Sequence, residues 1–289
     1  MARNGDLLLT AIAPAIWGST YLVTTELLPA GYPLTVSLLR ALPAGLLLLL
    51  LVRRLPSGMW WVRVFILGAL NFSIFWWMLF IAAYRLPGGV AATVGAIQPL
   101  IVLLLARVFL GAPVRALAVV AAIAGMAGVA LLILTPKAAL DPIGIAAGLA
   151  GAVAMAAGTV LSRRWQPPVS LLTFTAWQLT AGGLLLVPVV LALEPMLPMP
   201  SGANLLGYAW LGLIGAALTY ILWFRGIARL EPSVVSPLGF LSPLTAVILG
   251  WWALDQVLSP AQLIGMAIVL GSVWLSQRAQ QPRPRAPSP

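Results

Sequence analysis

RLPGGVAATVGAIQPL, residues 85–100, recurs in altered form as RLEPSVVSPLGFLSPL, residues 229–244. Both copies open with Arg-Leu, carry a Val five residues after the Arg, and close with Pro-Leu. The copies are 144 positions apart, close to half of the 289-residue chain. Each lies where one long apolar run meets the next, so we interpret it as a tight helical hairpin whose second arm contains a proline. The repeat predicts two related halves with a working site between them.

The composition assigns the chain to the bilayer. Hydrophobic residues make up 62% and charged residues 8%, whereas soluble domains carry about 25% charged residues. Cysteine and histidine are both absent from the sequence, which removes disulfides, thiolate metal sites and the commonest general base. The net charge of +10 comes from arginines placed between apolar runs. That spacing is typical of juxtamembrane anchors and argues against a nucleic-acid partner.

Ten apolar runs have the length of about 20 residues that crosses a bilayer. They cover residues 7–28, 32–52, 62–84, 88–110, 113–134, 142–162, 169–193, 205–227, 232–254 and 259–277. We therefore predict an all-α membrane protein with ten transmembrane helices. Residues 7–134 form one five-helix repeat, residues 142–277 form the second, and the polar, proline-rich tail 278–289 is expected to be disordered in the cytoplasm.

The basic residues predict the orientation of the spans. With a cytoplasmic N-terminus, the outer side receives only Arg85 and Lys137, against thirteen arginines on the inner side. The thirteen are Arg3, Arg53, Arg54, Arg63, Arg107, Arg115, Arg163, Arg164, Arg225, Arg229, Arg278, Arg283 and Arg285. Both termini should then be cytoplasmic in a bacterial-type inner membrane. An odd number of spans per half makes the halves inverted relative to one another; a chance match is disfavoured because Arg-Leu and Pro-Leu are not filler in a bilayer.

A known family shares these features. The early WGSTY (residues 17–21), Arg40 in the second span and the paired Pro-Leu spans resemble EamA-type transporters of the drug/metabolite transporter superfamily, from about residue 7 to 277. Within that group the chain looks like the YddG-type exporters of aromatic amino acids. One departure is that Gly111 and Ala112 stand where many members carry an acidic residue after the fourth span. The second half keeps Asp255 at the equivalent place.

The resemblance implies two EamA-like repeats around a central cavity. It also implies a secondary or facilitative transporter that exports small metabolites, chiefly aromatic or bulky apolar amino acids, across the inner membrane by alternating access. The alternatives are a broad-specificity drug or metabolite exporter and a sugar-nucleotide exchanger; a channel, a lipid scramblase and a membrane enzyme are more remote. Beyond solute and lipid, we expect no nucleic-acid partner, no obligate protein partner and no cofactor.

Arg40 is the most unusual residue, because it lies about 12 Å into its span by helical rise. It should face the protein interior or a wet cavity. A substrate role would make it the counter-charge of a solute carboxylate. A structural role would make it a buried tie between spans, which is slightly favoured because Gln178 stands at the equivalent place in the second half.

Pro99 and Pro243 should bend spans four and nine, with the polar residues Gln98 and Ser242 directly before them. A bending helix that lines a cavity needs such a pair, although a static kink that aids packing is an equal alternative. The other cavity candidates are deep aromatic and small polar residues, suited to an amphipathic or aromatic solute. They are Trp17, Tyr21, Asn71, Phe75, Thr93, Thr159, Thr219, Tyr220, Ser236 and Phe240; for any one of them, plain packing is the commoner fate.

The acidic residues all lie at or beyond the ends of spans: Asp6, Glu26, Asp141, Glu194, Glu231 and Asp255. Proton-driven carriers usually keep a carboxylate or histidine near the bilayer centre. We therefore predict facilitated diffusion, or a coupling that the sequence does not display. The sequence also lacks a glycine-rich phosphate loop and metal-ligand clusters, so catalytic and metal sites are not expected.

Overall fold

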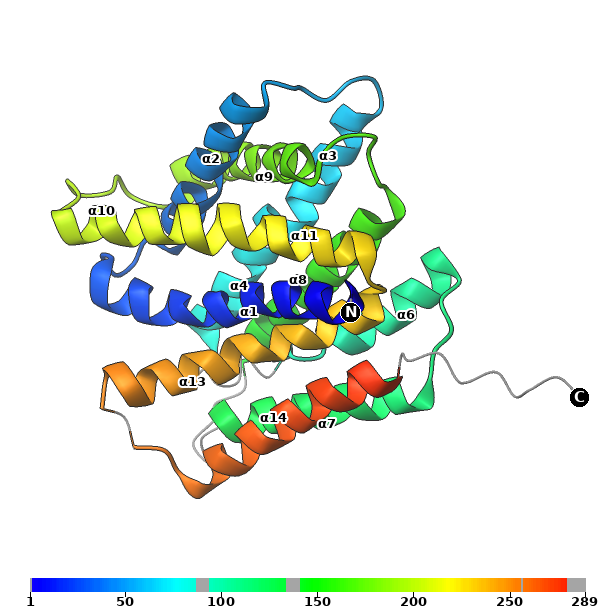
Figure 1. The fold of residues 1–289 in the computed structure, drawn as a ribbon. Coiled ribbons are helices and arrows are strands. Elements are labelled where there is room, and N and C mark those ends of the chain that lie inside the picture. Colours follow the sequence, from blue (N-terminus) through cyan, green and yellow to red (C-terminus); the bar gives the residue numbers. More distant parts are fainter. Residues whose placement is uncertain (1, 87–93, 134–140, 256, 280–289) are drawn as a thin grey trace, which may run out of the picture.

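The computed structural model describes residues 2–86, 94–133, 141–255 and 257–279. All regular elements in this part of the chain are helices (Figure 1). In chain order they are α1 (Ala2–Leu27), α2 (Pro33–Val52), α3 (Trp60–Gly68), η1 (Ala69–Ser73), α4 (Ile74–Arg85), α6 (Gln98–Leu110), α7 (Ala116–Ile133), α8 (Pro142–Arg164), α9 (Leu171–Leu193), α10 (Gly202–Ala209), η2 (Trp210–Leu218), α11 (Thr219–Arg229), α12 (Pro232–Val235), η3 (Ser236–Phe240), α13 (Leu241–Ala253) and α14 (Pro260–Ala279).

Within these residues, nine helical stretches are long and apolar enough to cross a membrane. They are Asn4–Leu27, Pro33–Val52, Trp60–Ala82, Ala116–Ile133, Pro142–Arg164, Leu171–Leu193, Gly202–Arg229, Pro232–Ala253 and Pro260–Ala279. They match nine of the ten predicted spans to within a few residues. The tenth prediction, 88–110, begins outside the described residues, and its described part is the 13-residue helix α6. The prediction of an all-α membrane protein is confirmed.

Local sequence signals set the helix ends. Proline stands in the first turn of α2, α6 and α8, where its missing N–H costs nothing. Asp141 and Ser170 cap α8 and α9 by accepting from the backbone N–H three residues later. Gly111 ends α6 with a φ of 67°, a left-handed conformation that glycine adopts without strain. These caps supply the backbone partners that lipid cannot.

Two of the spans contain a π-helix in the middle. Segment η1 joins α3 to α4, and η2 joins α10 to α11. Moved by the 144 positions that separate the repeated stretches, η1 falls inside η2. A π-helix loosens the regular backbone bonding and is frequent at functional sites. Ser73 Oγ, at the end of η1, donates to the carbonyl oxygen of Gly182 in α9 at 2.8 Å.

The helices of the two halves interlock (Figure 1). Helix α1 packs on α11 and α13 of the second half, while α8 packs on α4 and α6 of the first. Helices α2 and α9 pack on each other, as do α7 and α14. If helices at the same position in the two halves are paired (α1 with α8, α2 with α9, α4 with α11, α6 with α13 and α7 with α14), exchanging the members of each pair leaves this set of contacts unchanged. The interior of the bundle is therefore built jointly by both halves of the sequence.

Helices α2 and α9 approach each other closely because of small residues. A Cβ added at Gly45 would lie 2.5 Å from the backbone N of Thr180, and one at Gly183 would lie 2.7 Å from Cα of Leu42. Small residues are what allow such close backbone approach in membranes. The first residues of α1 and the last residues of α14 lie at the same end of the bundle (Figure 1).

Candidate functional site

Aromatic side chains from both halves meet at the centre of the bundle. The ring of Trp17, from α1, lies with its centroid 5.1 Å from the rings of both Tyr220 and Trp223 in α11. Phe72 of η1 lies 4.6 Å from Tyr220 and 5.4 Å from Trp76 of α4. We call these five residues the aromatic cluster. All but Trp17 are at most 4% exposed, so the rings stack mainly on one another in this conformation.

A chain of hydrogen bonds crosses the same region. Trp17 Nε1 donates to Thr219 Oγ1 at 2.9 Å, and Thr219 Oγ1 donates to the carbonyl oxygen of Gly215 at 2.9 Å. Arg40 Nη2 donates to the same carbonyl at 2.7 Å. Gly215 belongs to the π-helix η2, so the carbonyl oxygen of an irregular backbone segment accepts from side chains of α11 and α2.

Arg40 also contacts the aromatic cluster. Its guanidinium carbon lies 5.2 Å from the ring centroid of Trp76, within the range of a cation–π interaction. The side chain therefore bridges the halves, from α2 in the first to η2 in the second. This geometry serves the structural role that the sequence favours. It also holds a permanent positive charge beside an aromatic surface, as the substrate role requires.

A second polar group occupies the matching place in the other half. Asn71 Nδ2, in η1, donates to Gln178 Oε1 at 2.8 Å and to Ser162 Oγ at 3.2 Å. Asn71 and Gly215 are separated by the same 144 positions as Arg85 and Arg229. Thus α2 contacts η2 through Arg40, and α9 contacts η1 through Gln178.

In both spans four and nine, the regular α-helical pattern is interrupted just before the proline. A turn at residues 96–97 precedes α6, and Pro99 lies in the first turn of that helix. The 3-10 segment η3 precedes α13, whose third residue is Pro243. Ala96 shares a hydrophobic cluster with Phe240 and Leu244, so both interruptions border the same apolar core. Each proline therefore begins a helix after a break, where its missing N–H leaves no acceptor unfilled.

The remaining predicted residues are spread over the bundle. Phe75 packs at the edge of the aromatic cluster. Phe240 instead lies against Gly125 of α7, where an added Cβ would overlap its ring. Ser242 contacts α1, since a Cβ at Gly18 would come within 2.6 Å of its carbonyl oxygen. Thr93 lies outside the described residues, and so does the side chain of Tyr21.

Three predicted polar side chains keep a buried atom without a hydrogen-bond partner in the described part of the chain: Gln98 Nε2, Thr159 Oγ1 and Ser236 Oγ. Thr159 is fully buried on α8, next to Gly158, whose added Cβ would overlap Asn71. The structure thus brings Trp17, Thr219 and Tyr220 together with Arg40. Asn71 lies in a separate polar contact with α8 and α9.

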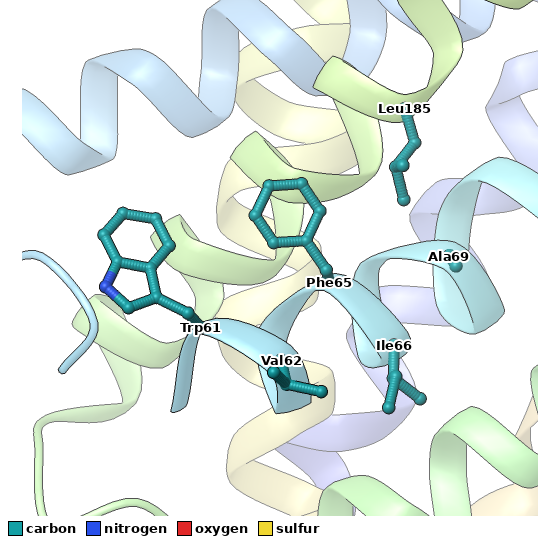
Figure 2. A pocket seen from close by; sticks show the side chains of 6 residues that line it. All are labelled: Trp61, Val62, Phe65, Ile66, Ala69 and Leu185. Carbon is teal, nitrogen blue, oxygen red and sulfur yellow. The ribbon is translucent and has the colours of Figure 1, made fainter. Parts of the chain in front are cut away.

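Two pockets open on the surface away from these residues. The first, of about 510 Å³, is lined by apolar side chains of α3, η1 and α9 (Figure 2). The second, of about 520 Å³, lies between α2, residues 197–200, α10 and η2. Neither pocket includes a residue that the sequence predicted to face the cavity. Their apolar walls suit the acyl chains of lipid.

Phe72 and Trp223 were not among the residues predicted to line the cavity. Phe72 and Trp76 are four residues apart, and Trp223 and Tyr220 are three apart, so each pair shares a helix face. That spacing was the available signal. Trp223 Nε1 has no hydrogen-bond partner among the described residues, although the side chain is 2% exposed.

The arrangement is suited to binding rather than to covalent chemistry. The described residues hold no group of three or more His, Cys, Asp or Glu that could bind a metal ion. What the centre offers is aromatic surface, a guanidinium and a few hydroxyl and indole donors. Such a surface recognises a flat or bulky apolar group with a negatively charged end.

Comparison with known proteins adds family and fold. The EamA-like transporter family is matched over residues 4–134 and again over 142–277. The chain is 48% identical over 267 residues to Protein PecM of Dickeya dadantii (strain 3937), covering 92% of this chain and 90% of PecM. It is 29% identical over 265 residues to the uncharacterized inner membrane transporter YedA of Escherichia coli (strain K12), covering 90% and 86% of the two chains.

A protein of known crystal structure superposes with a TM-score of 0.81 at 23% identity, over 95% of this chain and 98% of that one. At this identity the likeness shows the fold alone. The sequence had suggested the YddG-type exporters within the wider group; the relative at 48% identity is PecM instead. The wider resemblance to EamA-type transporters is confirmed.

Proposed function

The chain belongs to the EamA-like transporter family, and from that premise we propose that it exports an amphipathic metabolite across the inner membrane. It is a membrane transporter and not an enzyme. The proposed solute is an amino acid with an aromatic or bulky apolar side chain. The inner membrane as its location follows the name of the relative YedA.

One observation carries the solute class: the guanidinium of Arg40 lies over Trp76, beside the ring contacts of Trp17 and Tyr220. An amino acid offers a carboxylate to a guanidinium and a side chain to aromatic rings. The indole N–H of Trp223, which has no partner among the described residues, would supply a further donor. A sugar nucleotide, with two phosphates, would call for more than one deep cation.

The proposed cycle is alternating access between two inverted halves. Three observations support it. The helix contacts are the same when the two halves are exchanged, and the third span of each half contains a π-helix. The regular α-helix is also interrupted before Pro99 and before Pro243. Broken helices near the midplane are where many secondary transporters bind and move their solute. The rocking elements would be α6 and α13, turning about the breaks that precede them. Pro99 and Pro243 are the proposed hinges.

The experiment is solute flux in proteoliposomes that contain the purified protein. Labelled phenylalanine should equilibrate with saturable kinetics, and unlabelled aromatic or branched apolar amino acids inside the vesicles should accelerate it by counterflow. Threonine and a nucleotide sugar should compete weakly. Non-saturable flux without counterflow would indicate a channel and overturn the proposal. Competition by cationic drugs but not by amino acids would replace the solute with the broad-specificity alternative.

A further inference from the structure

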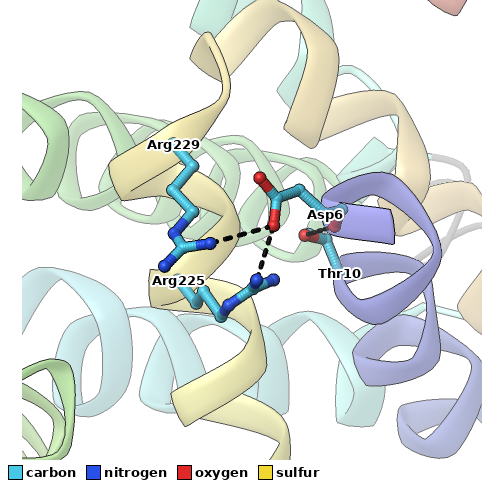
Figure 3. Close-up of polar contacts among 4 residues, drawn as sticks. All are labelled: Asp6, Thr10, Arg225 and Arg229. Atoms are coloured by element: carbon cyan, nitrogen blue, oxygen red, sulfur yellow. Dashed lines mark hydrogen bonds and ion pairs between the residues drawn. The ribbon is translucent and has the colours of Figure 1, made fainter. Parts of the chain in front are cut away.

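Ion-paired groups occupy matching places in the two halves. Asp6 of α1 lies between two arginines of α11, with Oδ1 2.6 Å from Arg225 Nη2 and 3.3 Å from Arg229 Nη1 (Figure 3). Arg85, the last residue of α4, has Nη1 3.7 Å from Oδ2 of Asp141, the residue before α8. Arg85 and Arg229 are the residues that open the two copies of the repeated stretch.

The two groups lie at opposite ends of the bundle. Helix α8 runs from one group to the other, so its length gives the distance between them. Asp141 precedes α8, while Arg163 near its other end donates to the carbonyl oxygen of Ile227, beside Arg229. The 23 residues of α8 rise about 35 Å at 1.5 Å each, close to the thickness of the hydrocarbon core. One ion-paired group therefore faces each side of the membrane.

Each group lies where two helices approach closely. At the Asp6 end, Thr10 donates its hydroxyl to the Asp6 carbonyl oxygen at 2.6 Å (Figure 3), and an added Cβ at Gly226 would overlap Thr10. At the other end, an added Cβ at Gly144 would lie 2.7 Å from Leu86. The ion pairs thus hold α1 against α11 at one end and α8 against α4 at the other.

The two ends are not equally tight. The side chain of Asp6 is 13% exposed and contacts two guanidinium groups, whereas the side chains of Arg85 and Asp141 are 46% and 36% exposed and share one long contact. Arg163 adds bonds to the carbonyl oxygens of Ile227 and Ala228 at the Asp6 end. Less exposed, doubly paired charges are screened less by water and salt. The ion-paired group around Asp6 is therefore the tighter of the two.

We propose that Asp6, with Arg225 and Arg229, and Asp141, with Arg85, are positioning residues that set the balance between the two access states of the transport cycle. Releasing Asp6 frees α1 from α11 and favours the state open at that end. Releasing Asp141 frees α8 from α4 and favours the opposite state. The proposal rests on the proposed function, because it needs a carrier with two access states. The ion pairs bind no solute themselves.

The test reads conformation without any solute. The chain has no cysteine, so Thr219→Cys, at a fully buried position of the candidate site, gives a single reporter for a membrane-impermeant thiol reagent. The reagent is applied to right-side-out and inside-out vesicles. Asp6→Asn should raise the labelling rate from the Asp6 side by about fivefold and lower it from the other side. Asp141→Asn should do the reverse by about twofold, because its pair is longer and more exposed.

Control variants distinguish a specific effect of the ion pairs from general destabilisation of the fold. Glu231→Gln removes an exposed carboxylate at the Asp6 end, 3.5 Å from the hydroxyl of Ser233, and should leave both rates unchanged. Asp6→Glu should restore the original side preference. If Asp6→Asn fails to fold, Arg229→Gln, which keeps Arg225 on Asp6, should give a smaller shift in the same direction. Equal acceleration from both sides, or no change from either, would overturn the proposal.

This outcome is separable from that of the flux experiment. If the protein carries none of the tested amino acids but the variants shift labelling in opposite directions, the proposed solute is wrong and the proposed role of the ion pairs stands. If the protein carries phenylalanine but every variant is labelled equally from both sides, the proposed solute stands and the proposed role of the ion pairs is wrong.

Discussion

Asn71 Nδ2 donates to Gln178 Oε1 across 2.8 Å, and this bond joins the π-helix of the first half to the seventh predicted span. Gln178 is fully buried and Asn71 is 1% exposed. The contact repeats, with the halves exchanged, the contact between Arg40 and Gly215. The Asn71–Gln178 bond joins two neutral amides, whereas the donor to Gly215 is the cation Arg40. Substitutions at the two places therefore test equivalent contacts without and with a charge.

Removing the neutral pair should cost stability. Gln178→Leu leaves Asn71 in apolar surroundings, with only Ser162 as a partner, and should lower the free energy of unfolding by about 1–2 kcal/mol. The double variant Asn71→Leu/Gln178→Leu should lose less than the sum of the single changes, because no polar atom is then stranded. Unfolding in mixed micelles measures both. Strict additivity would argue that the bond contributes little.

Removing the cation should affect solutes according to their charge. Arg40→Gln should raise the KM for phenylalanine at least about tenfold, since a guanidinium–carboxylate contact is charge-assisted. The same variant should leave the KM for phenylalanine methyl ester nearly unchanged. Arg40→Lys keeps the charge but loses the planar fork, so an intermediate KM is expected. Unchanged transport of phenylalanine with a lower melting temperature would assign Arg40 to the scaffold alone.

The close packing of α8 on η1 should not tolerate an added methyl group. Gly158→Ala would place a Cβ against the amide oxygen of Asn71 and should destabilise the protein by about 1–3 kcal/mol. Gly271→Ala is the matched control, because an added Cβ at this position in α14 meets nothing within 4 Å. That change should be neutral or slightly stabilising. Similar melting temperatures for the two variants would contradict the described packing.

The indole of Trp17 should matter as a donor as well as a ring. Trp17→Phe keeps an aromatic side chain and removes the bond from Nε1 to Thr219 Oγ1. We expect the KM for aromatic solutes to rise about threefold to tenfold, in line with one hydrogen bond. Thr219→Val removes the acceptor, so the double variant should be no worse than Trp17→Phe alone. An additive loss would mean that the two side chains act separately.

Both ends of the chain should emerge on the cytoplasmic side. The first residues of α1 and the last of α14 lie at one end of the bundle, which is the end that receives the predicted excess of arginine. Reporter fusions active in a single compartment would measure this at each terminus. Reporters active in opposite compartments would exclude the inverted pairing of the halves.

The spans could be read from the sequence because lipid allows few solutions. An apolar run of about 20 residues has to be helical if its backbone groups are to be satisfied. The interior contacts could not be read in the same way. Asn71 and Gln178 are 107 positions apart, so their bond depends on how the halves are set against each other. No local pattern encodes that setting.

Irregular backbone segments explain why the surroundings of two aromatic residues could not be predicted from the sequence. Phe240, a predicted cavity residue, is the last residue of the 3-10 segment η3 and packs against Gly125. A 3-10 turn has three residues instead of 3.6, which adds about 20° per residue and about 100° over the five residues of η3. A helical wheel drawn from Pro232 therefore misplaces every side chain beyond the segment. Trp223 follows the π-helix η2. It was not predicted to line the cavity, although it shares a helix face with Tyr220 and its ring contacts that of Trp17.

Helix α8 is unbroken between Pro142 and Arg164, whereas its neighbours α4 and α11 each continue from a π-helix. A continuous helix of that length is expected to tilt as one body. If its Arg163 end moves away from α11, its Asp141 end must swing the opposite way about whatever holds its middle. Gly148 and Gly151, which lie against Val94 and Met78, are where that fulcrum would be. In the proposed alternating-access cycle, a stiff α8 that tilts about these glycines would close one end of the bundle as it opens the other, which would disfavour a state open to both sides.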